Sequence, residues 1–145
     1  MREVRSKFEA TLDSLELIRH FVAEFMAKAH LPDDQINNFE VAVDEHISNL
    51  VEHAFQNLPG KTVTVTCRDE RSKSQVIIAD KSEGFDPRNY SIPDVEDAAI
   101  YEMPPGGFGN YFIFELMDEV EYLHRPFVKN ELILAVYKHQ ADQVV

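Results

Sequence analysis

The sequence predicts an α+β fold, a two-layer sandwich in which one mostly antiparallel sheet carries its helices on one face. Helical periodicity occupies most of the first half of the chain, and short alternating stretches typical of strands lie before and after it. The chain has 145 residues and contains no linker or internal repeat that would divide it. We therefore expect a single domain over residues 1–145, large enough to bury a core without disulfides.

The first expected elements are a strand and a helix. Apolar or small residues alternate with charged ones from Val4 to Ala10, which predicts a short strand. Residues 11–29 then place apolar side chains at helical spacing, and Asp13 or Ser14 can cap the start of this helix. Its apolar face consists of Leu15, Ile18, Val22, Phe25 and Met26.

A long central helix should follow. Pro32 ends the preceding element, Asp33 or Asp34 can cap the new helix, and the Asn-Leu-Pro-Gly sequence at residues 57–60 is a stop signal. Steps of three and four residues separate the apolar positions, so these side chains form one stripe. The stripe consists of Ile36, Phe39, Val43, Ile47, Leu50 and Ala54.

The opposite side of this helix carries the first candidate site residues. Glu45 and Asn49 lie one turn apart and roughly opposite the stripe, with His53 a further turn along. A carboxylate and an amide at this spacing can reach one bound ion or ligand. A solvated helix face is the ordinary alternative, but apolar neighbours such as Val41 and Val51 indicate a helix that is covered on more than one side.

The second half of the chain should contain two hairpins and one more helix. Alternating Val and Thr residues predict the first hairpin, and the glycines and prolines that follow interrupt any periodicity. A loop of that length in a compact domain is usually functional or disordered. We expect strands at 61–67 and 76–79, a loop at 80–109, a helix at 111–117 and closing strands at 120–123 and 132–137.

The start of this loop is the second candidate site. Asp80 ends a strand that is expected to be buried, and Gly84 follows four residues later. A carboxylate in that position could accept a hydrogen bond from an exocyclic amino group, and a glycine would let the backbone approach a flat ligand. An aspartate in an ordinary turn is the alternative.

The end of the loop is the third candidate site. Gly106, Gly107 and Gly109 precede the second-half helix, where they could present backbone N–H groups to phosphates. A flexible hinge is the alternative. The motif is not a Walker loop, because no Lys-Ser or Lys-Thr pair follows it.

Charge and cysteine content restrict the class of protein. The net charge of −12 argues against direct binding to nucleic acid or to anionic membranes, although backbone amides and one divalent cation can still bind phosphates. Cys67 is the sole cysteine, which we expect to be a buried strand residue. The amino-terminal segment lacks the apolar core of a signal peptide, so we expect a cytoplasmic protein.

Taken together, the three candidate sites resemble the boxes of the gyrase, heat-shock chaperone, histidine kinase and MutL ATPase superfamily, known as the GHKL or Bergerat fold. The residues around these boxes resemble those of the anti-sigma-factor serine/threonine kinase branch, and the resemblance extends from the first helix to the last strand. The matching positions are Glu45 and Asn49 for the E-x-x-x-N box, Asp80, Ser82 and Gly84 for the D-x-G-x-G box, and Gly106, Gly107 and Gly109 for the GGxG box.

The resemblance implies a role for each position. Asn49 would coordinate the Mg²⁺ that bridges the ATP phosphates, and Glu45 would act as the general base. Asp80 would accept a hydrogen bond from the adenine amino group, with Gly84 beside the adenine ring. The GGxG glycines would hold the phosphates, and the segment 88–105 would form the ATP lid. These roles suit phosphoryl transfer, where positioning and charge neutralisation dominate.

Three sets of positions depart from the family pattern, one of which is Asn110 and Tyr111 after the GGxG box, where small or aliphatic residues are more usual. Ser82 replaces the first glycine of the D-x-G-x-G box, and a positive φ there would cost serine ~1 kcal/mol. Lys129-Asn130-Glu131 stands near the last strand, where many members of the family have Gly-Thr close to adenine. None of the three departures removes the expected base or metal ligand.

By resemblance, the chain would be a Mg²⁺-ATP-dependent serine/threonine kinase. Its substrate would be a STAS-domain anti-anti-sigma protein, and its second partner a sigma factor that it regulates. A homodimer is compatible with this interpretation. The alternative is a non-catalytic ATP-binding regulatory module that sequesters a protein partner.

Overall fold

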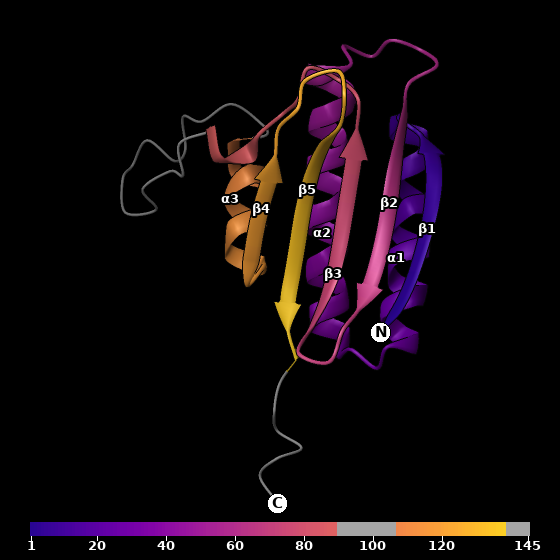
Figure 1. Cartoon of the computed structure of the whole chain (residues 1–145), viewed down its shortest axis with the longest axis vertical. Helices are drawn as coiled ribbons and strands as arrows, with labels where there is room; N and C mark the ends of the chain where they lie inside the picture. Colours follow the sequence, from indigo (N-terminus) through magenta and orange to yellow (C-terminus); the bar gives the residue numbers. More distant parts are fainter. Residues whose placement is uncertain (90–106, 139–145) are drawn as a thin grey trace, which may run out of the picture.

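The computed structural model describes residues 1–89 and 107–138, which form one sheet with helices on one of its faces (Figure 1). The predicted α+β sandwich is therefore confirmed. The strands are β1 (Arg2–Glu9), β2 (Thr62–Asp69), β3 (Lys73–Asp80), β4 (Glu119–Leu123) and β5 (Asn130–Tyr137), and the helices are α1 (Leu15–Lys28), α2 (Asp33–Asn49) and α3 (Gly107–Leu116).

The sheet has the strand order β1-β2-β3-β5-β4, and every neighbouring pair is antiparallel. The two expected hairpins, β2–β3 and β4–β5, are both present. The last strand β5 lies between β3 and β4, so that Asp80 at the end of β3 is directly opposite Asn130 at the start of β5. Residues that are 50 positions apart in the chain thus become neighbours at one end of the sheet.

The core lies between the sheet and the helices. The apolar face of α1 and the stripe of α2 pack against the inward residues of the strands, as their periodicity predicts, although Ala54 at the end of the stripe is half-buried. Cys67 is fully buried on β2, and burial raises the pKa of its thiol to about 12, which agrees with a structural role. The fully buried residues of α2 are Phe39, Ala42, Val43, His46 and Ile47.

The ends of two helices differ from the sequence prediction. Pro32 is the N-cap residue of α2, and no side chain caps the helix; Asp33 and Asp34 lie in the first turn, where their charges favour the positive end of the helix. Helix α3 begins at Gly107 and not at Tyr111. Helix α3 packs against α2.

The central helix also changes its winding after Asn49. Residues Leu50–Ala54, labelled η2, form a π-helical turn in which the N–H of Phe55 donates to the carbonyl of Leu50 at 2.7 Å. Such turns are rare and occur frequently at functional sites. This one widens the helix directly after a candidate ligand residue.

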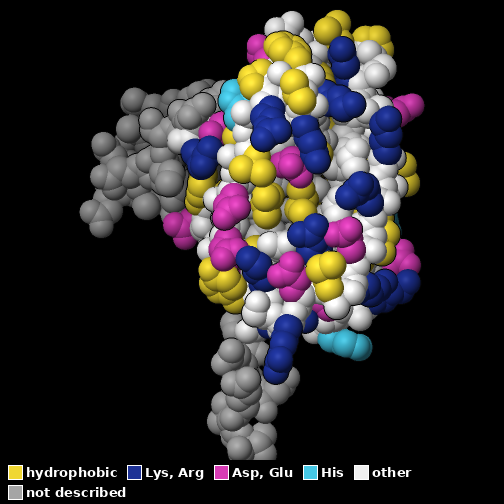
Figure 2. Space-filling model, viewed as in Figure 1, with side chains coloured by type: hydrophobic (Ala, Val, Ile, Leu, Met, Phe, Trp, Pro, Cys, Tyr) yellow, Lys and Arg dark blue, Asp and Glu magenta, His cyan; other side chains and the backbone are white. Residues whose placement is uncertain are grey.

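The other face of the sheet is open among the described residues, and its surface mixes Lys and Arg, Asp and Glu, and apolar side chains (Figure 2). No helix in the described part of the chain is long and apolar enough to cross a membrane.

Candidate functional site

The carboxylate of Asp80 is the centre of the polar cluster at the end of β3. The side chain is 3% exposed. Its Oδ1 atom accepts three hydrogen bonds, from the N–H of Ser82 at 2.9 Å, from the Ser82 hydroxyl at 2.6 Å and from Asn130 Nδ2 at 3.1 Å. Its Oδ2 atom is buried and has no hydrogen-bond partner among the described residues. Leaving a buried acceptor unpaired costs about 1–3 kcal/mol, so this oxygen is suited to a ligand that donates a hydrogen bond.

Ser82 supports this carboxylate and is not strained. Its φ is not positive, so the conditional ~1 kcal/mol cost of a serine in place of glycine does not arise. The Ser82 hydroxyl donates to Asp80 and accepts from the N–H of Gly84 at 2.9 Å. The hydroxyl therefore links the aspartate to the turn that follows it.

Ser82→Ala should lower the free energy of unfolding by about 1–3 kcal/mol, because it removes a buried hydrogen bond to a charged acceptor and leaves the Gly84 N–H without its partner. Urea denaturation followed by circular dichroism measures the change. Ser72→Ala is the matched control, since Ser72 is exposed in the β2–β3 turn and the substitution should cost less than about 0.5 kcal/mol. Equal stabilities of the two variants would show that the Ser82 hydroxyl is dispensable.

Asn130 is a site residue that sequence reasoning missed. Its amide nitrogen donates to Asp80 Oδ1 and, at 2.8 Å, to the carbonyl of Ser82, while its Oδ1 accepts from the N–H of Arg125 at 3.1 Å. The side chain is fully buried. Asn130 and Glu131 are two polar residues at the start of an otherwise apolar strand, which was the available signal, but its meaning depends on the pairing of β3 with β5.

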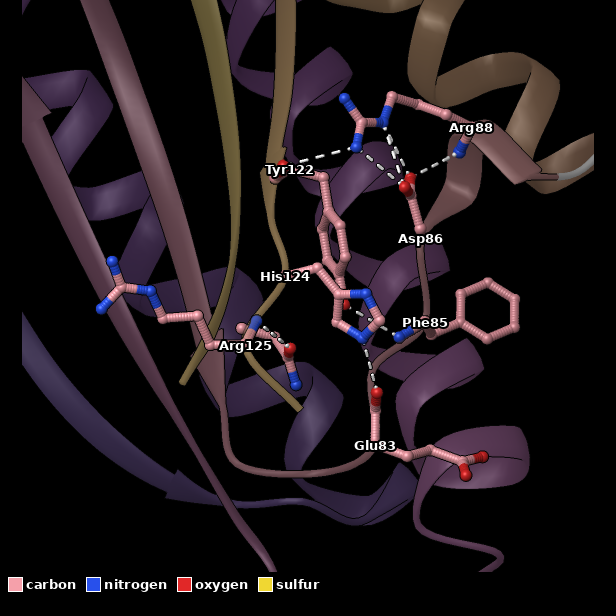
Figure 3. A network of polar contacts seen from close by, with 8 residues as sticks. Glu83, Phe85, Asp86, Arg88, Tyr122, His124 and Arg125 are labelled. Carbon is pink, nitrogen blue, oxygen red and sulfur yellow. Dashed lines mark hydrogen bonds and ion pairs between the residues drawn. The ribbon is translucent and has the colours of Figure 1, made fainter. Parts of the chain in front are cut away.

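The loop after Asp80 is attached to β4 (Figure 3). His124 Nε2 lies 2.7 Å from the carbonyl oxygen of Glu83, and the N–H of Phe85 donates to the hydroxyl of Tyr122 at 3.0 Å. Gly84 has a φ of +106°, and a Cβ built on it would lie 2.7 Å from both His124 Nε2 and the Tyr122 hydroxyl. The positive φ disfavours any other residue at this position, and an added Cβ would also displace the ends of the Tyr122 and His124 side chains.

An ion pair holds the next part of the loop. Arg88 Nη2 lies 2.8 Å from Asp86 Oδ2, and the same nitrogen donates to the carbonyl of Tyr122 at 3.3 Å (Figure 3). Burial alone would raise the pKa of Asp86, but the hydrogen bonds and charge of Arg88 outweigh it and lower that pKa. Asp86 thus remains a carboxylate beside the candidate site.

Helix α2 turns one face toward this loop. The ring of His53 stacks on that of Phe85 with centroids 5.5 Å apart, and the charges of Asp80 and Asp86 act on His46. Asn49 lies three residues after His46 and four before His53, so it belongs to the same helical face. Its side chain is 5% exposed. The structure thus brings Asn49 to the side of α2 that faces the end of β3.

Glu45 lies beside this face in a half-buried position. Burial raises the pKa of its carboxyl group, and the negative charges of Glu52 and Asp44 raise it further. A carboxylate with a raised pKa is a stronger base than an exposed one. Glu45 therefore has the protonation chemistry that suits a general base.

His46 is the least expected member of the cluster. It is fully buried, and neither ring nitrogen has a hydrogen-bond partner within residues 1–89 and 107–138. Burial lowers its pKa to about 4, against the opposing effect of Asp80 and Asp86. The imidazole is consequently neutral at physiological pH.

Acidification should destabilise the protein through His46. Its folded pKa of about 4 lies below the ordinary value of 6.5, so its contribution is fully present above pH 6.5 and is lost as the pH falls toward 4. The loss should amount to about 2 kcal/mol at about pH 5. Urea denaturation at about pH 7.5 and pH 5 measures it. In His46→Leu the loss of stability on acidification should be correspondingly smaller. His20→Gln is the control at an exposed position and should show the full loss. An unchanged loss in His46→Leu would contradict the assignment to His46.

The third candidate segment is described only in part. Gly106 and most of the expected lid at 88–105 lie outside the described residues. Gly107 and Gly109 form the first turn of α3, where backbone N–H groups lack partners within the helix. A helix start at the glycines agrees with the expected geometry of a phosphate site.

No group of three or more His, Cys, Asp or Glu residues that could hold a metal ion occurs in the described part of the chain. These side chains alone therefore form no metal site in the described part of the chain. Mg²⁺ has different requirements, because it retains several waters and binds through one or two protein oxygens together with substrate phosphates. The side-chain oxygen of Asn49 is compatible with that mode.

Comparison with protein families gives one match over most of the chain. The model of the histidine kinase-like ATPase domain matches residues 8–136. Among similar proteins, the serine-protein kinase RsbW of Staphylococcus aureus is 26% identical over 141 residues, which cover 94% of this chain and 89% of that protein. The serine-protein kinase RsbW of Bacillus cereus is 24% identical over 125 residues, covering 84% of this chain and 78% of the relative.

A solved structure shows the same fold. The crystal structure of the RsbU and RsbW domains of Rv1364c from Mycobacterium tuberculosis superposes with a TM-score of 0.63 at 15% sequence identity. The match covers 94% of this chain and 32% of the other, so this chain spans about a third of that larger protein. At this identity the likeness supports the fold alone.

Proposed function

Since this chain belongs to the histidine kinase-like ATPase domain family and is similar to its anti-sigma-factor kinase branch, we propose that it is a cytoplasmic, Mg²⁺- and ATP-dependent protein serine/threonine kinase. The observation that carries the proposal is the carboxylate of Asp80, in which one oxygen is saturated by hydrogen bonds and the other is buried without a partner among the described residues.

The polar groups fit an adenine nucleotide. Asp80 Oδ2 is an acceptor that suits an exocyclic amino group, and Ser82 and Asn130 keep the carboxylate in one orientation. Gly84 and the turn around it would lie beside the adenine ring. The glycines Gly106, Gly107 and Gly109 would bind the phosphates through backbone N–H groups at the start of α3.

The face of α2 fits the reacting end of the nucleotide. Mg²⁺-ATP supplies the phosphoryl group and neutralises the charge that develops during transfer. Asn49 is the residue that would hold the metal ion. Glu45, one turn earlier and with a raised pKa, would accept the proton of the attacking hydroxyl group without ligating the metal. The half-buried position of Glu45 would limit the access of water to this proton transfer.

The protein substrate that we propose is a Ser or Thr residue of a STAS-domain anti-anti-sigma protein, with a sigma factor as the second partner. The similar proteins named serine-protein kinase RsbW support this choice of substrate class. The proposed regulation follows from competition, because a kinase engaged with one partner would release the other.

Transfer of label from γ-labelled ATP to a purified STAS-domain protein of the same organism tests the proposal. We expect Mg²⁺-dependent labelling that disappears when the acceptor Ser or Thr is replaced by Ala. If the wild-type chain labels none of the encoded STAS-domain proteins, yet binds one of them only when ATP is present, the chain is a non-catalytic regulatory module.

A further inference from the structure

The open face of the sheet contains a groove whose lining extends to Asp80 and Ser82 of the candidate nucleotide site but includes neither Glu45 nor Asn49. Its volume is about 600 Å³, and it lies over β1, β2, β3 and β5, between the loop at 54–61 and the loops at 81–83 and 127–129. Apart from Asp80, its residues on the strands are the outward-facing ones, with Thr64, Ile77 and Ala79 at the centre. The groove is therefore separate from α2 and from the candidate base and metal ligand.

Strand register shows the direction of this groove. Lys7 is paired with Thr64, Thr64 with Ala79, and Ala79 with Glu131, which gives one row of side chains across four strands. Three interstrand steps of about 4.8 Å make the row about 14 Å long. A helix lying along it would present about ten residues, since each residue advances a helix by about 1.5 Å.

The groove has five cationic side chains and three carboxylates, those of Asp80, Glu83 and Glu131, in a protein that is acidic as a whole. Figure 2 shows Asp and Glu side chains interspersed over the strands of this face with Lys and Arg side chains. Four of the five cationic side chains, those of Arg5, Lys7, Lys61 and Lys81, are exposed and form no ion pair with any residue that the structure describes. With a net charge of −12 on the chain, such a local excess of unpaired cations would attract an acidic partner to this face.

The groove also has apolar surface and one exposed aromatic anchor. Ile77 and Phe55 are largely buried in its floor, whereas Leu58 is 54% exposed and Phe127 is 72% exposed. Phe127 has a φ of +61°, which is unfavourable for a bulky residue, and its N–H donates to the carbonyl of Ser82 at 2.8 Å. The backbone is thus held in a strained conformation that leaves a large aromatic side chain in solvent, as is typical of contact residues in interfaces.

From the unpaired cations, the apolar floor and the exposed Phe127, we infer that this groove docks an acidic amphipathic helix of a protein partner, lying across the strands. Leucine or aromatic residues on one side of the helix contact Ile77, Leu58 and Phe127. Carboxylates on its flanks pair with the unpaired cations. The docking requires no nucleotide, so it stands or falls separately from the proposed kinase activity.

The probe is a fluorescein-labelled helical peptide of about 14 residues, in which a stripe of Leu and Phe is flanked by Glu. Fluorescence anisotropy should show binding to the full chain that weakens with added salt, and a peptide with Gln in place of every Glu should bind at least about tenfold more weakly. Equal binding of the Glu and Gln peptides would overturn the inference, because the unpaired cations would then have no role.

Two matched pairs of variants locate the contact. The double variant Lys7→Glu with Lys61→Glu should lower the affinity for the acidic peptide by at least about tenfold. The double variant Arg71→Glu with Lys28→Glu changes the net charge equally and should lower this affinity by less than about threefold. Phe127→Ala should also weaken binding, in contrast to Leu17→Ala, which removes a similarly exposed apolar side chain from α1.

A thermal melt of each variant, monitored by circular dichroism, confirms that it is folded before it is compared. Equal effects of the two charge pairs would show that general electrostatics, and not the groove, binds the peptide. Analytical ultracentrifugation tests whether a second copy of this chain, and not a partner helix, occupies the groove. A dimer that Lys7→Glu with Lys61→Glu dissociates, and that the peptide does not displace, would mean that a second copy of this chain covers the groove, which would also overturn the inference.

Discussion

Glu45→Gln should keep ATP affinity within about an order of magnitude while lowering the rate of phosphoryl transfer to a STAS-domain protein by about 10²-fold or more. The amide retains the shape of the side chain but cannot accept the proton of the attacking hydroxyl. Because the role of Glu45 would be confined to the transfer step, the loss should appear in kcat at saturating nucleotide. Labelled-phosphate transfer and calorimetric titration with ATP measure the two quantities.

The pH dependence of transfer gives this prediction a second readout. The base must be ionised, so the rate should fall as the pH is lowered through the raised pKa of Glu45. The charge of Glu52 contributes to that raised pKa, and Glu52→Gln should therefore move the acid limb to lower pH while transfer persists. Phosphoryl transfer by Glu45→Gln at the wild-type rate would exclude Glu45 as the base. An acid limb of the pH–rate profile that Glu52→Gln does not shift would exclude it as well.

Asn49→Ala should abolish the increase in ATP affinity that Mg²⁺ provides, because the substitution removes the side-chain oxygen that would ligate the metal ion. Calorimetric titrations with Mg²⁺ and with a chelator measure this increase, which should be at least about tenfold in the wild-type chain. Asn49 lies in the core-facing part of α2, so a circular dichroism melt must accompany the titration.

The matched control is Asn37→Ala. Asn37 is exposed near the start of the same helix, so its removal changes the amide content of α2 without reaching the face of His46 and Asn49. It should retain the full effect of Mg²⁺. A folded Asn49→Ala variant that responds to Mg²⁺ as the wild type does would exclude Asn49 as the metal ligand.

Local patterns in the sequence were sufficient to predict the elements of the fold. The stripe from Ile36 to Leu50 is buried as its spacing predicts, and alternation identified the strands that precede and follow the loop. Such patterns record which side of an element is apolar, and this depends on neighbours within a few residues. The position of Asp80 at the end of a buried strand followed from the same reasoning.

Features that depend on distant pairing could not be predicted in this way. The insertion of β5 between β3 and β4 brings Asn130 to Asp80, and the contacts of the loop with Tyr122 and His124 accompany the positive φ that favours glycine at position 84. The π-helical turn after Asn49 and the positive φ of Phe127 are also unmarked by any local motif. In each case the conformation is fixed by tertiary contacts that outweigh weak local preferences.

The central claim is that Asp80 recognises the amino group of adenine, and nucleotide discrimination tests it most directly. In Asp80→Asn the position of Oδ1 must remain an acceptor for its three donors, so the NH₂ group takes the place of Oδ2 and turns the acceptor into a donor. Calorimetry should compare ATP with purine riboside triphosphate, which lacks the amino group. The wild-type chain should prefer ATP by at least about tenfold, and Asp80→Asn should lose that preference together with its ATP affinity. Equal affinities of the wild type for the two nucleotides, or full ATP affinity in Asp80→Asn, would contradict the claim.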